Sequence, residues 1–145
     1  MKTPSIFIDK KGRWFQDGVP ITHRWTYLEN NRNLRKSAGG GFEVAEGGVV
    51  IPVEVEDTPF VIVSAELTGE GIKVGINDET GELLTEGSIL SVGTDNVPYA
   101  LIKGGEFRAR FLSPAYYAIA DAAAPQSGGG FVVEFAGRRY SFPPR

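Results

Sequence analysis

Three basic residues near the end of the chain have the spacing of an anion-binding surface. Arg108 and Arg110 alternate with apolar residues, so a strand would place both guanidinium groups on one face. The Gly104-Gly105 pair predicts a tight hairpin turn that brings Lys103 to the same face. Two guanidinium groups and one ammonium group can bind phosphate through charge-assisted hydrogen bonds. The alternative is that they pair with acidic side chains of the chain itself.

Three aromatic residues are candidates to stack on a nucleobase. They are Trp14, Tyr116 and Tyr117. Large aromatic residues beside turns are more often part of the core, and this alternative stays open.

Carboxylates cluster at Glu54, Glu56 and Asp57. Such a group can serve acid–base chemistry or bind a hard cation, and we keep Asp57 as a candidate ligand-binding residue. The simpler interpretation is a charged face that protects an edge strand beside Pro52.

Residues for covalent catalysis are scarce. The chain has no cysteine and one histidine, His23, and no serine lies in a Gly-x-Ser-x-Gly motif. We therefore expect no enzyme, no catalytic residues, no metal and no cofactor.

Composition describes a soluble protein. The 145 residues are 41% hydrophobic, include 19 glycines and carry a net charge of −3, which disfavours nucleic acid as a partner. Residues 1–36 carry a charge of +5, residues 37–102 carry −11 and residues 103–145 carry +3. No apolar run is long enough for a membrane span, and the start does not resemble a signal peptide, so we expect a cytoplasmic protein.

Apolar periodicity predicts strands with two helices among them. Thr22 is expected to cap a helix over residues 23–36, with Gly39 to Gly41 as its stop. A second helix is expected after the Ser113-Pro114 pair, with Ser113 as its N-cap. Its apolar face would hold Tyr116, Ile119, Ala120 and Ala123.

Two glycine-rich segments, residues 39–44 and 128–133, match in five of six positions and are 89 residues apart. Each follows a predicted helix. We infer an α+β protein of duplicated hairpin–helix–hairpin units around antiparallel sheets. The expected parts are an N-terminal α+β subdomain over residues 1–57 and a C-terminal strand-rich subdomain with one helix over residues 58–145.

Several stretches resemble the bacterial domain-of-unknown-function family 1285. They occur in that family's order and span most of the chain: residues 12–15, 18–21, 52–60, 80–82, 98–110 and 114–117. The Val55-Glu-Asp-Thr-Pro-Phe60 stretch and the Trp14 hairpin with Gly18-Val-Pro-Ile21 form its most specific pair. The sequence departs from the family pattern by a compressed segment between Pro52-Val-Glu54 and Val55-Glu-Asp57, and by a shorter chain.

The resemblance implies a duplicated core whose C-terminal half is loosely pleckstrin-homology-like. It also implies a binding site between the two halves and a role in nucleotide-based signalling, with no established activity. The leading hypothesis is therefore a non-enzymatic module that binds a small anionic ligand, such as a nucleotide, between its halves. The alternative is a protein-interaction adaptor that uses exposed sheet edges, acidic around Glu54 and Glu56, without a small ligand.

Overall fold

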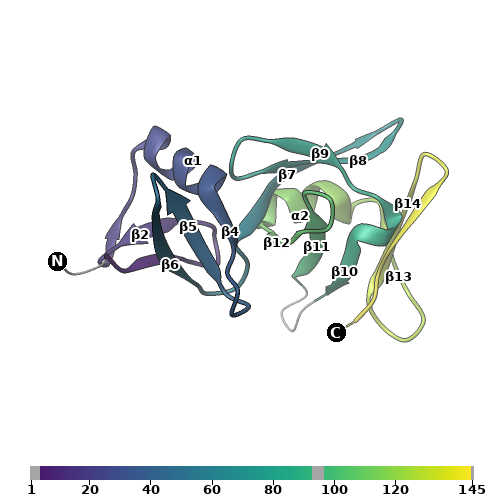
Figure 1. The fold of residues 1–145 in the computed structure, drawn as a ribbon. Helices are drawn as coiled ribbons and strands as arrows, with labels where there is room; N and C mark the ends of the chain where they lie inside the picture. Colours follow the sequence, from purple (N-terminus) through teal and green to yellow (C-terminus); the bar gives the residue numbers. More distant parts are fainter. Residues whose placement is uncertain (1–3, 93–96, 145) are drawn as a thin grey trace. The chain divides into compact units, whose positions relative to one another are not determined.

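The computed structural model describes residues 4–92 and 97–144 and has a mixed α+β architecture (Figure 1). Residue contacts cluster into two compact units that divide between Pro59 and Phe60. The α+β class predicted from the sequence is confirmed. Within the described ranges, no helix combines the length and the apolarity that crossing a membrane requires.

The first unit is one six-stranded sheet with one helix. The strand order is β3-β2-β1-β6-β5-β4, and β6 returns to pair in parallel with β1. The elements in chain order are β1 (Ile6–Ile8), β2 (Trp14–Gln16), β3 (Val19–Pro20), α1 (Arg24–Asn33), β4 (Leu34–Lys36), β5 (Phe42–Glu46) and β6 (Val49–Val55). Ile6, Ile8 and Val53 are buried at this parallel pair, so the centre of the sheet carries part of the core.

Helix α1 is shorter than the sequence predicts. It begins at Arg24 after His23, which makes no side-chain cap, and it ends at Asn33 rather than at residue 36. Leu34 is buried and belongs to β4, where it pairs with Val44 of β5. Burying this leucine in the sheet stabilises the chain more than another helical turn would, because the asparagines before it are poor helix formers. Residues 39–41 therefore form the turn between β4 and β5 and do not stop the helix.

The acidic segment is not an edge strand, so the simpler interpretation of Glu54 and Glu56 was wrong. Strand β6 has β5 on one side and β1 on the other. Pro52 lies one residue before the stretch that pairs with β1, where a residue without an N–H group is tolerated. Glu54 lies on the solvent face of an interior strand, and Glu56 accepts a hydrogen bond from the backbone N–H of Lys10 at 3.0 Å.

The second unit contains a six-stranded sheet of order β10-β11-β12-β7-β8-β9, the helix α2 and a three-stranded sheet of order β13-β14-β15. In chain order the elements are β7 (Phe60–Thr68), β8 (Gly71–Ile76), β9 (Gly81–Leu83), the short 3₁₀ helix η1 (Glu86–Ser88), β10 (Ile89–Val92), β11 (Pro98–Ile102), β12 (Phe107–Phe111), α2 (Ser113–Ala120), β13 (Ala123–Pro125), β14 (Phe131–Phe135) and β15 (Arg138–Phe142). The large buried side chains of Phe60, Tyr140 and Phe142 form much of its core.

The start and the buried face of α2 also differ from the prediction. Leu112 is the N-cap residue, and Ser113 is already helical. Ala115 and Ile119 are the buried residues, whereas Tyr116 is half-buried. The helix ends at Ala120, and Ala123 belongs to β13, as Leu34 belongs to β4 in the first unit.

The two glycine-rich segments lie in hairpins with the same strand register. Leu34 pairs with Val44 and Ala123 pairs with Val133; Phe42 pairs with Val53 and Phe131 pairs with Phe142. Each pair in the second unit lies 89 residues after its counterpart in the first. The turns agree too, because Ser37 N donates to Gly41 O and Gln126 N donates to Gly130 O. The repeat inferred from sequence is therefore present in the backbone hydrogen bonding.

The repeat extends beyond the hairpins. Val55 pairs in parallel with Ile8, and Pro144, 89 residues later, makes a parallel bridge with Val92 of β10. The first unit thus consists of three strands, then α1, then three more strands. The second unit repeats this order with β10–β12, α2 and β13–β15. The meander β7–β9 is the additional part of the second unit, and it joins the repeat by pairing β7 with β12.

Candidate functional site

The two arginines of β12 lie on one face of the strand, as the sequence predicts. Phe107, Ala109 and Phe111 are buried, Arg108 is exposed and Arg110 is half-buried. The cross-strand partner of Arg108 is Leu101, and that of Arg110 is Tyr99. Strand β12 therefore separates a basic outer face from an apolar inner face.

Arg108 is held against an aromatic ring. The Cζ atom of its guanidinium group lies 5.1 Å from the centroid of the Tyr99 ring, within the range of a cation–π contact. Tyr99 itself is largely buried, so the ring is a fixed support. Among the described residues, Arg108 makes no ion pair with a carboxylate. Its N–H donors are thus open to solvent while its position is restrained.

Lys103 is not part of this basic face. Its ammonium group donates to Asp78 Oδ2 at 2.6 Å and lies 5.0 Å from the centroid of the Phe60 ring. The backbone of Lys103 adopts a φ of 54° in the hairpin turn, so its side chain leaves the strand alternation that the sequence analysis assumed. Burial raises the pKa of Asp78, but hydrogen bonds from Lys103 and Thr80 outweigh it and hold that pKa below its ordinary value.

The tyrosines of α2 pack against each other and against the three-stranded sheet. The Tyr116 ring lies 5.8 Å from that of Tyr117 and 6.3 Å from that of Phe131, both edge to face. Tyr117 is 68% exposed and Tyr116 is half-buried. Their ring contacts, within the described part of the chain, do not include Arg108.

Trp14 is a core residue, and this removes it from the candidate site. It is 2% exposed, and its indole N–H donates to Asn31 Oδ1 at 3.0 Å inside the first unit. A ring buried in this way has no free face for a base. Asp57 lies in the bend after β6 and is half-buried.

Tyr99 is the residue that the sequence analysis missed. The Gly104-Gly105 turn implies that residues 101 and 108, and residues 99 and 110, face each other. This register, applied to the arginines, would have placed Tyr99 beside them. No group of three His, Asp or Glu side chains among the described residues is arranged to hold a metal ion.

The chain is thus a two-unit α+β protein in which a strand–helix–strand arrangement repeats. Its fold is similar to two solved structures of DUF1285 family proteins. One, from Silicibacter pomeroyi DSS-3, has a TM-score of 0.76 and 20% identity, over 98% of this chain and 80% of that chain. The other, from Shewanella baltica OS155, has a TM-score of 0.64 and 18% identity, over 81% of this chain and 91% of that chain.

No family model matches the sequence, and no curated protein matches it significantly. The predicted resemblance to the DUF1285 family is confirmed at the level of fold. Both similar proteins are known only as members of a family of unknown function, so the likeness of fold assigns no activity to this chain.

Proposed function

We propose that the protein is a non-enzymatic binding module for a small anionic ligand, with Arg108 as the main anion-binding residue. The observation that carries this proposal is an exposed guanidinium group that is fixed over Tyr99 and is not neutralised by a carboxylate of the described residues. Exposed arginines are more often mobile or paired with acids.

A restrained arginine suits anion recognition for two reasons. Its planar group offers two parallel N–H donors that match the oxygens of a phosphate or carboxylate. Because the cation–π contact already limits its rotamers, less side-chain entropy is lost when a ligand binds. Arg110 projects from the same face of β12 and adds positive charge nearby.

A nucleotide is the ligand class that we propose, because the resemblance to the DUF1285 family implies nucleotide-based signalling. A cytoplasmic location and a pleckstrin-homology-like C-terminal half belong to the same proposal. We also propose that the module lacks catalytic activity; phosphodiesterase or phosphatase turnover with a divalent metal, abolished by Asp57→Asn, would contradict this.

The test is thermal unfolding against a panel of nucleotides and cyclic dinucleotides, at low and moderate salt. A ligand at 100 times its Kd adds about 2.7 kcal/mol, which is several degrees for a chain of this size. Arg108→Ala should remove the shift. The matched control is Arg139→Ala, because Arg139 is also exposed but is paired with Glu134 at 2.6 Å. Equal shifts in both variants would place the ligand elsewhere.

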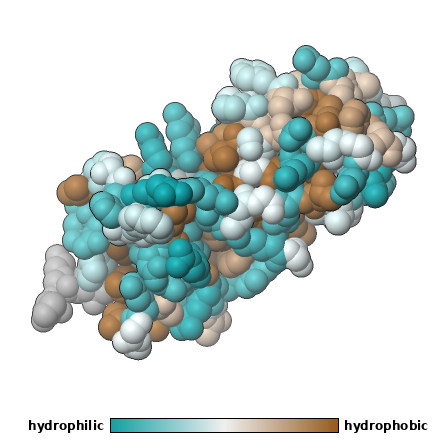
Figure 2. Space-filling model, turned by 90° about the horizontal axis from the view of Figure 1, so that it is seen from above, coloured by the Kyte–Doolittle hydropathy of each residue, from teal (hydrophilic) through white to brown (hydrophobic). Residues whose placement is uncertain are grey.

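A protein-interaction adaptor is the second candidate, and exposed apolar side chains of the first unit favour it. Trp25 and Val19 are each 65% exposed, and Val19 lies in the edge strand β3. On the face shown in Figure 2, hydrophobic residues reach the surface among hydrophilic ones. Tryptophan is frequent at the energetic centre of interfaces.

No thermal shift across the nucleotide panel would favour this second function. A pull-down should then return one stoichiometric partner, and the Trp25→Ser, Val19→Ser double variant should lose it. Retention of the partner by that variant would exclude these two side chains as its contacts.

A further inference from the structure

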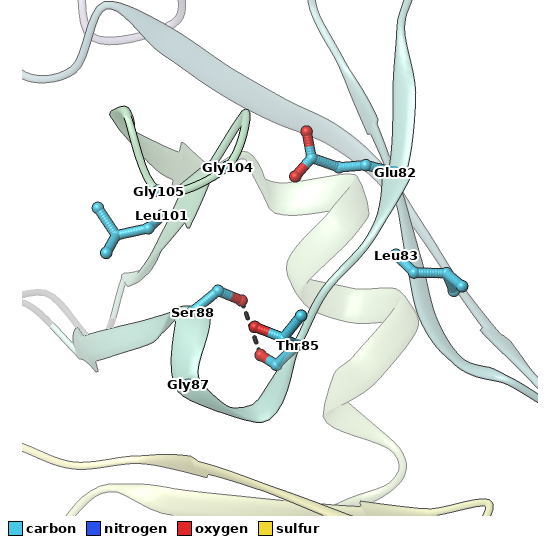
Figure 3. A pocket seen from close by; sticks show the side chains of 8 residues that line it. All are labelled: Glu82, Leu83, Thr85, Gly87, Ser88, Leu101, Gly104 and Gly105. Carbon is cyan, nitrogen blue, oxygen red and sulfur yellow. Dashed lines mark hydrogen bonds between the residues drawn. The ribbon is translucent and has the colours of Figure 1, made fainter.

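A pocket of the second unit lies between the turn that joins β11 to β12 and the segment formed by β9 and η1. The turn between β11 and β12 reaches β9, because the backbone N–H of Lys103 donates to Glu82 Oε1 at 3.1 Å and to Oε2 at 3.2 Å. The pocket beside this contact has a volume of about 320 Å³, which is at the small end of the roughly 300–1,000 Å³ of ligand sites (Figure 3). Its lining consists of Glu82, Leu83, Thr85, Gly87, Ser88, Leu101, Gly104 and Gly105.

Glu82 is the charged group of this pocket, and it has no cationic partner among the described residues. The ammonium group of Lys103 is directed to Asp78 and Thr80 instead. Glu82 is half-buried and receives hydrogen bonds from one backbone N–H group. A carboxylate offers about four lone-pair positions, so most of its acceptor capacity is unused. A partly desolvated carboxylate gains from a cation that brings N–H donors.

The remaining lining sets the shape and polarity of the occupant. The side chains of Leu83 and Leu101 point away from the Glu82 carboxylate, so they form no apolar wall beside it (Figure 3). Ser88 donates its hydroxyl hydrogen to the backbone carbonyl of Thr85 at 2.7 Å, so this part of the wall is fixed (Figure 3). Three lining positions are glycines, which leave room beside the carboxylate. The pocket therefore combines an anionic acceptor with small and hydroxyl-bearing lining residues.

We propose that this pocket binds an organic cation, a primary ammonium or guanidinium group on a short aliphatic stem. The cation donates to Glu82, and the glycines at positions 87, 104 and 105 leave room for the stem. A free amine and the side chain of a lysine or arginine in a partner share this chemistry. The site is distinct from Arg108, which attracts the opposite charge. This proposal can therefore be tested independently of the proposed function.

The first measurement is a titration of the full-length ¹⁵N-labelled protein with butylammonium and with butylguanidinium. The amide signals of Gly87, Gly104 and Gly105 report on the pocket, and that of Gly75, which does not line it, serves as the control. We expect saturable shifts at the first three, with a Kd on the order of 1 mM for so small a ligand. Equal shifts with 1-butanol, or no saturable shift up to about 50 mM, would overturn the proposal.

Two variants test the role of the carboxylate. Glu82→Gln keeps an acceptor for the N–H of Lys103 but removes the charge, and it should weaken cation binding about tenfold or more. Glu66→Gln makes the same change of charge on strand β7, which β8 separates from β9 and which lies outside the pocket, and it should bind like the natural protein. Binding unchanged in Glu82→Gln would overturn the assignment.

A third variant keeps the test independent of the contact between Glu82 and Lys103. Gly87 lines the pocket and a Cβ atom there meets nothing within 4 Å, so Gly87→Leu should fold and place a large side chain at the pocket wall. It should abolish the cation-induced shifts, and retained binding would contradict the site. Comparison with N-acetyl-lysine and N-acetyl-arginine N-methylamides then separates the two sources. Much tighter binding of these amides points to a basic partner segment, and equal binding points to a free amine.

Discussion

Asp9 shows how one residue fixes a turn in the first unit. Its Oδ1 atom accepts the backbone N–H groups of Lys11 at 3.0 Å and Arg13 at 2.8 Å, and its Oδ2 atom accepts Arg13 Nε at 2.6 Å. Burial raises the pKa of Asp9, but these hydrogen bonds and the guanidinium charge outweigh it and hold the pKa below its ordinary value. The ionised form is therefore favoured by folding.

This lowered pKa predicts how stability depends on pH. A carboxylate with a depressed pKa stabilises the fold above its ordinary pKa of 3.8, and the contribution is lost as the pH falls through the lower, folded value. We expect Asp9→Asn to lower the free energy of unfolding by about 1–3 kcal/mol at neutral pH, with a smaller further loss in acid. Urea denaturation from about pH 7 down to about pH 3 measures both effects.

The control for this prediction is Asp121→Asn, which changes an exposed carboxylate at the end of α2. It should leave the acid limb of the stability curve unchanged. An Asp9→Asn curve that runs parallel to that of the natural protein would show that Asp9 does not contribute to acid sensitivity.

At the scale of elements, the repeated hairpins provide a matched pair of glycines. Gly130 has a φ of 73°, and a Cβ atom there would overlap the backbone carbonyl oxygen of Phe142. Gly41, 89 residues earlier, has no positive φ, and its Cβ would lie 3.5 Å from Ser37 Oγ, an ordinary contact. The same turn position is thus demanding in one hairpin and permissive in the other.

Alanine substitutions at these two positions should therefore differ. Gly130→Ala should destabilise the protein by at least about 1–3 kcal/mol, since it combines strain with a steric overlap at the backbone. Gly41→Ala should change stability by less than about 1 kcal/mol. Thermal unfolding of both variants measures this difference, and similar losses would show that the two turns are not distinct in the way described.

Local pattern predicted the elements well where their partners are close in sequence. The Gly104-Gly105 hairpin and the arginine face follow from spacing alone. The end of α1 did not, because Leu34 is drawn into β4 by its pairing with Val44. Lys103 was misplaced because Asp78, 25 residues earlier, determines where its side chain lies. Such contacts have no local signal that a sequence pattern can report.

The interior position of β6 was missed for the same reason. Its alternation of apolar and acidic residues indicates one wet face, which is correct, but the pattern cannot tell an edge strand from an interior one. The neighbour that makes it interior is β1, at the other end of the first unit. Tyr99 differs from these cases, because the hairpin register was sufficient to find it.

For the molecule as a whole, the second unit contains all the strand partners of its own sheets. Strands β7–β12 pair among themselves, as do β13–β15, and the core around Phe60, Tyr140 and Phe142 belongs to this unit. A fragment of residues 60–145 should therefore fold with a single cooperative transition. Calorimetry of the fragment, with an amide spectrum that overlays on that of the full chain, measures this. A fragment without dispersed amide signals would contradict it.

The two parallel contacts, between β1 and β6 and between Val92 and Pro144, also determine the order in which the chain can fold. Ile8 and Val55 are 47 positions apart, whereas the hairpin of β5 and β6 joins Glu46 to Val49. Forming the distant pair costs more loop-closure entropy than forming the hairpin. Its free energy therefore becomes favourable only after the hairpins and α1 have shortened the effective loop. The same holds for Val92 and Pro144. Closure of β1 on β6 and of β10 on the chain after β15 should be the slow steps, and variants at those pairs should change the refolding rate more than variants in the turns.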